Sequence, residues 1–216
     1  MSYIASKILM IPIVLIALTF HEFSHGFVSS KLGDPTPGLT GRLSLNPMAH
    51  LDPMGALLMV LTGFGWARPV QIDARCYKNP KWGMAITAAA GPLSNLLLAF
   101  LAMIIYTVIL ILNIKTGLFS GAIDTISGFV LMFVQVNLCF MVFNLIPIPP
   151  LDGSRILGLF LSTRSYFKLQ QLERYSFMII IVLSLTGVFD RIIGTGVGVV
   201  LTGLINFCNM IVQLVV

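Results

Sequence analysis

Charged residues are scarce in this chain. Of its 216 residues only 10% are charged and 57% are hydrophobic, whereas a soluble domain carries about 25% charged residues. The longest polar segment, residues 31–52, has 22 residues and is too short for a separate soluble domain. The apolar stretches are long and lack the ten-residue alternation of an outer-membrane barrel. The composition therefore predicts an all-α membrane protein with a single membrane-embedded domain over residues 1–216.

Cysteine and acidic residues are also few. The three cysteines lie far apart and form no CxxC pair, so no disulfide framework or cysteine metal site is expected. The net charge of +5 comes from basic residues in short loops between apolar segments, which indicates the positive-inside bias of membrane proteins rather than a nucleic-acid partner. The N-terminal apolar run has no small-residue cleavage site, and we expect it not to be a signal peptide.

The apolar segments predict a polytopic bundle of about five transmembrane helices. They cover residues 3–30, 84–114, 126–146, 175–189 and 192–216. A further uncharged run, residues 54–66, has 13 residues, which is short of the roughly 20 that a spanning helix needs. We interpret this run as a re-entrant or interfacial hairpin after the first helix. Such a hairpin could hold an extended strand by edge pairing.

The positions of the basic residues predict the orientation in the membrane. With the N-terminus outside and the short hairpin not crossing, ten lysines and arginines fall inside and three (Lys7, Lys115 and Arg191) fall outside, which accounts for all 13. Cytosolic loops carry the excess of basic residues. We therefore expect a multi-pass protein with its N-terminus outside and its active site toward the cytosol, and we expect it in a prokaryotic cell (inner) membrane.

Residues 21–25 read His-Glu-Phe-Ser-His and lie within the first apolar segment. Histidines at i and i+4 share one face of a helix, so His21 and His25 could bind one zinc ion while Glu22 activates a water molecule. Ionisable residues at membrane depth are costly and usually functional. The alternative is a pair of core histidines hydrogen-bonded between helices. The pattern favours a zinc hydrolase with its site inside the membrane.

A catalytic zinc site needs a third protein ligand, and the eight acidic residues limit the choice. Asp152 is the strongest candidate, because it follows the third span at the cytosolic end, where the first span carries its histidines. The prolines before it prevent a regular helix, and Gly153 permits unusual backbone angles. An extended stretch there could direct the carboxylate into the bundle. The alternative for Asp152 is a helix cap or loop carboxylate.

Together these motifs resemble the site-2 proteases, a family of intramembrane zinc metalloproteases. The resemblance rests on HEFSH at 21–25, GPLSN at 91–95, NLIPIPPLDG at 144–153 and the loop at 41–55. It implies one Zn²⁺ held by His21, His25 and Asp152, with Glu22 as the catalytic glutamate. It also implies that Asn144 and Asn95 lie near the substrate or the developing oxyanion, and that the substrates are transmembrane proteins. The chain is similar to the compact form without a PDZ or nucleotide-sensing domain.

Other interpretations of these polar residues stay open. Asn144 could join helices by a hydrogen bond, and Asn95 beside Gly91-Pro92 could mark a packing kink. We interpret His50 and Asp52, in the proline-rich loop, as structural residues.

The competing class of protein is a membrane metal transporter or metal-binding scaffold that uses the same His/Asp cluster. A transport path would need polar residues in both halves of the membrane, and the outer halves are apolar. The sequence does not indicate an oligomeric state or a particular substrate.

Overall fold

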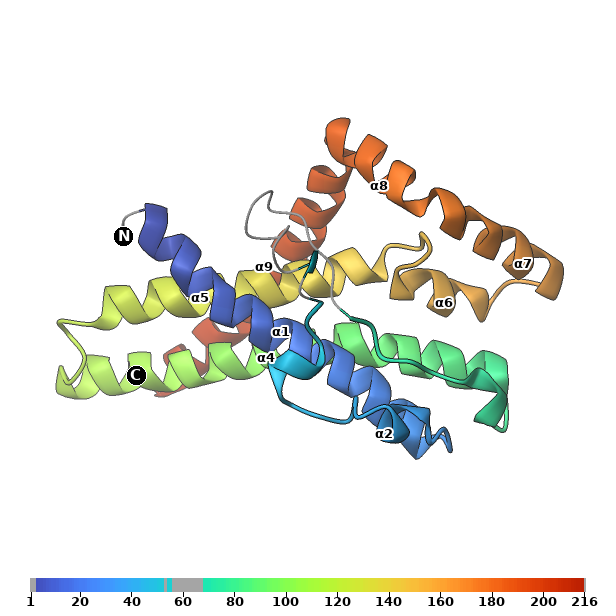
Figure 1. Cartoon of the computed structure of the whole chain (residues 1–216). Helices are drawn as coiled ribbons and strands as arrows, with labels where there is room; N and C mark the ends of the chain where they lie inside the picture. The colour runs from blue at the N-terminus through green and yellow to red at the C-terminus, as the bar shows by residue number, and fades with distance from the viewer. Residues whose placement is uncertain (1–2, 53, 56–67, 216) are drawn as a thin grey trace.

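The computed structural model describes residues 3–52, 54–55 and 68–215 (Figure 1). Its regular elements there are α-helices and short 3-10 helices. They are α1 (Tyr3–Lys31), α2 (Thr36–Leu39), η1 (Pro47–Ala49), η2 (Ala74–Cys76), α4 (Pro80–Thr116), α5 (Ile123–Leu145), α6 (Asp152–Gly158), α7 (Thr163–Gln171), η3 (Leu172–Tyr175), α8 (Ser176–Leu185) and α9 (Val188–Val215). The predicted hairpin at 54–66 lies almost entirely outside the described residues. A single domain over residues 1–216 stays a prediction.

Within the described part of the chain, four helices are long and apolar enough to cross a membrane. They are residues 9–31 of α1 and the whole of α4, α5 and α9. This confirms the prediction of an all-α, multi-pass integral membrane protein. The segment predicted as a further span, residues 175–189, is divided between the end of η3, the ten-residue helix α8 and the start of α9. Gly187 follows that helix with φ +70°, a left-handed conformation that ends it and starts α9.

Helices α4 and α5 form an antiparallel pair, α1 crosses them and α9 packs behind them (Figure 1). The main core lies where α4, α5 and α9 meet and includes Ala99, Leu138 and Val197. A smaller apolar cluster of Ile13, Ala17 and Val136 joins α1 to α5. Lipid is as apolar as these side chains, so helices in a membrane associate through close packing and interhelical hydrogen bonds.

A row of small and polar residues joins α1 to α4, and we call it the α1–α4 seam. Its members recur every four residues on each helix, which places them on one face. They are His21, His25 and Ser29 on α1 and Thr87, Gly91 and Asn95 on α4. All six are buried. Because polar groups are costly in lipid, this seam faces the interior of the bundle.

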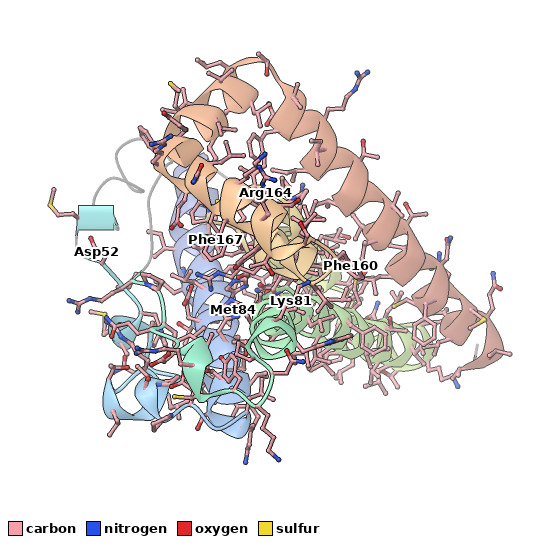
Figure 2. The ribbon with its side chains drawn as sticks, turned by 90° about the vertical axis from the view of Figure 1, so that its right-hand side faces the viewer. Asp52, Lys81, Met84, Phe160, Arg164 and Phe167 are labelled. Atoms are coloured by element: carbon pink, nitrogen blue, oxygen red, sulfur yellow. The ribbon has the colours of Figure 1, made fainter. Side chains whose placement is uncertain are left out.

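The segment after α5 returns the chain toward this seam. Residues 146–151 form turns, and α6 starts at Asp152. Gly153 has ordinary helical angles and uses none of the unusual ones that a glycine permits. A Cβ at Gly153 would instead collide with the main chain at Leu145 and Ile146, so glycine allows α6 to pack closely against the end of α5. The Nζ of Lys81 donates to the carbonyl of Leu161 at 2.7 Å and ties the turn before α7 to the start of α4 (Figure 2).

Candidate metal centre

Three side chains converge inside the bundle. Asp152 Oδ2 lies 3.2 Å from the Nε2 atoms of both His21 and His25. The two Nε2 atoms lie 3.1 Å apart. The exposed fractions of the three residues are only 4%, 6% and 7% for His21, His25 and Asp152. The structure therefore brings together the three residues predicted as ligands, although Asp152 follows His25 by more than a hundred residues.

The second nitrogen of each histidine ring is held by an acceptor. His21 Nδ1 lies 2.8 Å from Asn95 Oδ1. His25 Nδ1 lies 2.7 Å from the main-chain carbonyl of Thr87. Asn95 orients its amide by donating to the carbonyl of Ala17, so its oxygen faces the ring. Both Nδ1 atoms are therefore the protonated donors, and in the neutral ring each Nε2 atom presents a lone pair to the cluster.

With both imidazole rings neutral, three electron-pair donors face one another in this cluster. Asp152 Oδ2 is buried and has no hydrogen-bond donor among the described residues. Such an arrangement is repulsive unless a cation lies between the atoms. A tetrahedron with zinc–ligand bonds of about 2.0–2.1 Å has edges of about 3.3 Å. The observed triangle has nearly that size, so these atoms match one face of a tetrahedral site.

Gly91 makes room for the histidine rings on the opposite helix. A Cβ at this position would lie 2.5 Å from His25 Nε2 and 2.6 Å from His21 Cε1. Real Cβ atoms do not approach other atoms so closely, so a glycine is required unless the rings move. The close approach of α4 to the two histidines therefore depends on the missing side chain.

Glu22 is half-buried and is anchored by the chain segment that precedes α4. Its Oε2 accepts a hydrogen bond from the main-chain N–H of Val70 at 3.0 Å. Val70 is itself buried and contacts α1 at Gly26. Glu22 is not part of the triangle of ligand atoms, which leaves its carboxylate available for proton transfer.

The two asparagines predicted near the reacting atoms lie in different settings. Asn95 is fully buried, and its amide nitrogen donates to Ala17 O and to Asn137 Oδ1, both at 3.0 Å. Since its oxygen meets His21, all its hydrogen-bonding groups are engaged in positioning. Asn144 is half-buried and donates to the carbonyl of Phe140, one turn back in α5. Among the hydrogen bonds of the described residues, none joins Asn144 to the three converging side chains.

The two loop residues lie apart from the cluster. His50 is fully buried, and its Nε2 lies 2.7 Å from the carbonyl of Ser44. Asp52 accepts hydrogen bonds from the main-chain N–H groups of Met54 and Gly55. Neither belongs to the His21–His25–Asp152 group, the cluster with metal-ligand spacing in the described part of the chain.

Sequence reasoning missed the residues that support the ligands. The sequence analysis assigns no role to Thr87 or Asn137, which lie in apolar segments, and it uses Gly91 only in the GPLSN motif and as part of a possible kink. A usable signal was present, because Thr87, Gly91 and Asn95 repeat with the same four-residue spacing as the histidines. Polar residues on one face of a membrane helix predict a functional or packing partner.

Comparison with known proteins identifies the class. A profile described as Peptidase family M50 matches residues 111–187, a range that includes Asp152. The chain belongs to this family, the site-2 proteases, and is a membrane zinc metalloprotease.

Several curated relatives carry the words zinc metalloprotease in their names. YwhC of Bacillus subtilis is 38% identical over 174 residues, which cover 80% of this chain and 78% of that protein. Rip2 of Mycolicibacterium smegmatis is 31% identical over 88% of this chain and 72% of its own length. Rip2 of Mycobacterium tuberculosis H37Rv is 29% identical, with 86% and 70% covered. No solved structure gave a significant match.

Replacement of Asp152 by asparagine should remove zinc from the protein. The substitution keeps the shape but deletes the negative charge that balances the cation. We expect zinc affinity to fall by more than the roughly 10–100-fold that outer-shell replacements cost. Chelator competition followed by elemental analysis measures this loss. Asp124→Asn, at an exposed position in the first turn of α5, is the matched control and should keep its zinc.

Proposed function

We propose that this protein hydrolyses peptide bonds within or next to the transmembrane segments of other membrane proteins, as in regulated intramembrane proteolysis. The observation that carries the proposal is the burial of His21, His25 and Asp152 between helices that are long and apolar enough to span a membrane. A site at that depth is reached most directly by a substrate that is itself in the bilayer. The proposal is of one zinc ion, because the three ligand atoms define a single site.

The roles of the chain's own groups follow from their contacts. When bound, zinc polarises the scissile carbonyl and lowers the pKa of the attacking water. Glu22 accepts the proton of that water and later passes it to the leaving amine. The N–H of Val70 fixes the direction of the Glu22 carboxylate during these transfers. Asn95 and the carbonyl of Thr87 hold the histidine rings in the tautomer that binds metal.

Asn144 is proposed as a donor to the oxyanion or to the substrate backbone. Its amide has two hydrogens, and one is engaged with Phe140. The second can donate to a substrate carbonyl. Asn95 is assigned instead to positioning, because its donors are already bonded. The substrate must present an unwound segment, since the carbonyls of an intact helix are occupied.

The proposed orientation places the site toward the cytosol of a prokaryotic cell. The end of α1, the start of α4 and the turn before α7 lie at one end of the bundle, as the Ser29–Tyr77 and Lys81–Leu161 hydrogen bonds indicate. Ten of the 13 lysines and arginines belong to the segments at this end. The positive-inside rule supports a cytosolic location for them.

Reconstituted enzyme should cut a single-span substrate whose helix contains glycine or proline near its cytosolic end. A substrate of the same length with an all-leucine helix should be cut at least tenfold more slowly, because its backbone stays helical. Mass spectrometry locates the cut bond, which we expect inside or next to the apolar segment. Removing zinc with a chelator should abolish cleavage, and added zinc should restore it.

Two results would contradict the proposal. One is cleavage confined to soluble peptides, and the other is full activity after zinc has been removed and its absence verified by elemental analysis. Zinc transport into sealed vesicles, measured with a fluorescent indicator in the same preparation, would instead support the transporter class.

A further inference from the structure

A buried chain of hydroxyl groups runs beside the metal centre. Ser29 Oγ lies 2.7 Å from Tyr77 Oη, which lies 3.2 Å from Thr87 Oγ1. At its other end Ser29 donates to Asp34 Oδ2 at 2.7 Å. Ser29, Asp34 and Thr87 are fully buried, and Tyr77 is only 5% exposed. Thr87 is also the residue whose carbonyl accepts the hydrogen bond from His25. The Asp34 carboxylate is thus linked through three hydroxyls to Thr87, and the main-chain carbonyl of Thr87 contacts His25.

The direction of each hydrogen bond can be deduced. A hydroxyl has one hydrogen, and Ser29 uses its own on Asp34. Tyr77 must therefore donate to Ser29, and Thr87 must donate to Tyr77. All three hydrogens point toward Asp34, and every member has a defined partner. The side chain of Thr87 is held by this order instead of turning to a carbonyl of its own helix.

Asp34 reaches this position because α1 ends sharply. Gly33 has φ +105°, a conformation that favours glycine, and it turns the chain back so that the Asp34 N–H bonds the carbonyl of Ser29. Burial alone would raise the pKa of Asp34, but hydrogen bonds from Thr36, Asp73 and Ser29 outweigh it and hold the pKa below its ordinary value. Asp34 is therefore a carboxylate.

The same carboxylate fixes the segment that holds Glu22. The main-chain N–H of Asp73 donates to Asp34 Oδ2 at 2.8 Å. Three residues earlier, the N–H of Val70 donates to Glu22. Four residues later, the ring of Tyr77 lies over Gly83, where a Cβ would come within 2.6 Å of its Cγ. Residues 70–77 are thus attached to α1 at Glu22 and Ser29, to Asp34 just after α1, and to α4 at Thr87.

We propose that Tyr77 is a positioning residue of the metal centre, acting with Ser29 and Asp34. Its hydroxyl joins α1, α4 and residues 70–77 at one point. It thereby holds the Thr87 carbonyl against His25 and keeps the Val70 N–H in place for Glu22. This inference rests on the proposed function for its catalytic part, whereas its effect on metal binding can be measured without any substrate.

The test compares Tyr77→Phe with Tyr106→Phe in the full-length protein. Tyr106 also bonds one serine hydroxyl, Ser127 Oγ at 2.7 Å, and joins α4 to α5 away from the metal centre. Both variants lose only a hydroxyl. We expect Tyr77→Phe to lower zinc affinity about tenfold, in line with outer-shell effects. Its kcat should fall with KM unchanged, and the visible absorption bands of the cobalt-substituted protein should shift. Tyr106→Phe should leave the zinc affinity, the kcat and the cobalt absorption bands unchanged.

The outcomes separate this inference from the proposed function. If wild type cuts no membrane substrate but Tyr77→Phe still weakens zinc binding and shifts the cobalt spectrum, positioning stands and the function fails. Equal loss of zinc affinity in both variants, or unchanged zinc affinity and spectrum in Tyr77→Phe, would overturn the positioning role. Ser29→Ala provides a second variant, because it removes the next hydroxyl in the chain, and it should reproduce the spectral shift.

Discussion

Glu22→Gln should abolish cleavage while leaving zinc bound. General acid–base catalysis contributes about 10²–10⁴-fold, so the rate should fall by at least a hundredfold. Zinc content should not change, because Glu22 contributes no atom to the ligand triangle. Glutamine keeps an oxygen that can accept the Val70 N–H, so residues near Val70 should stay in place. Cleavage rate and zinc content, measured on the same preparation, test both parts.

The chain offers a matched control for this substitution. Glu173, in η3, is its other glutamate and is exposed. Glu173→Gln should behave as wild type. Retained activity in Glu22→Gln would remove Glu22 from the mechanism, and loss of zinc would make it a ligand or a structural residue. In cells, membrane fragments that appear with wild type and are absent with Glu22→Gln would identify the substrates.

Gly91→Ala should disrupt the metal centre although alanine is the better helix former. The added Cβ would lie 2.5 Å from His25 Nε2, so a ring or a helix must move. Overpacking of this kind costs about 1–3 kcal/mol. Since 1.4 kcal/mol is a factor of ten, zinc affinity should fall about 10- to 100-fold. Proteolytic activity at limiting zinc should fall with it.

Gly128→Ala is the control for helix propensity. Gly128 lies within α5, and a Cβ there would meet no atom within 4 Å. This variant should bind zinc normally and be slightly more stable, because glycine is about 1 kcal/mol less favourable than alanine in a helix. If both variants bound zinc as wild type does, the close packing of α4 against the histidines would not matter for the site.

The candidate ligands could be predicted because their positions follow from local rules. The four-residue spacing of His21 and His25 fixes a shared face of any helix. Asp152 follows a long span and a run of prolines, which limits where its carboxylate can lie. The supporting contacts could not be predicted in this way. Asn95 was expected near the substrate, but only the packed helices show that its amide is fully bonded.

The boundaries of the spans show the same limit. Composition alone predicts the apolar helices, because the bilayer requires about 20 apolar residues for each crossing. The segment 175–189 is at least as apolar, yet its helix α8 has only ten residues. The left-handed φ angle at Gly187 ends the helical stretch before it reaches spanning length. The sequence does not predict this angle, because a glycine permits it without requiring it. The approach of Asp34 to Ser29 likewise depends on how Gly33 turns the chain.

The hydroxyl chain beside the metal centre ends at Thr87, whose carbonyl has no hydrogen to release. A proton therefore cannot travel along it between Asp34 and His25 in either direction. The three hydroxyls therefore position the Thr87 carbonyl, but they do not carry protons between the reaction and the buried carboxylate of Asp34. Protons that the hydrolysis takes up or gives off must then reach the site by a route outside these hydroxyls. Mutations of Ser29, Tyr77 or Thr87 should change the rate of the enzyme through geometry, and not through loss of a proton donor.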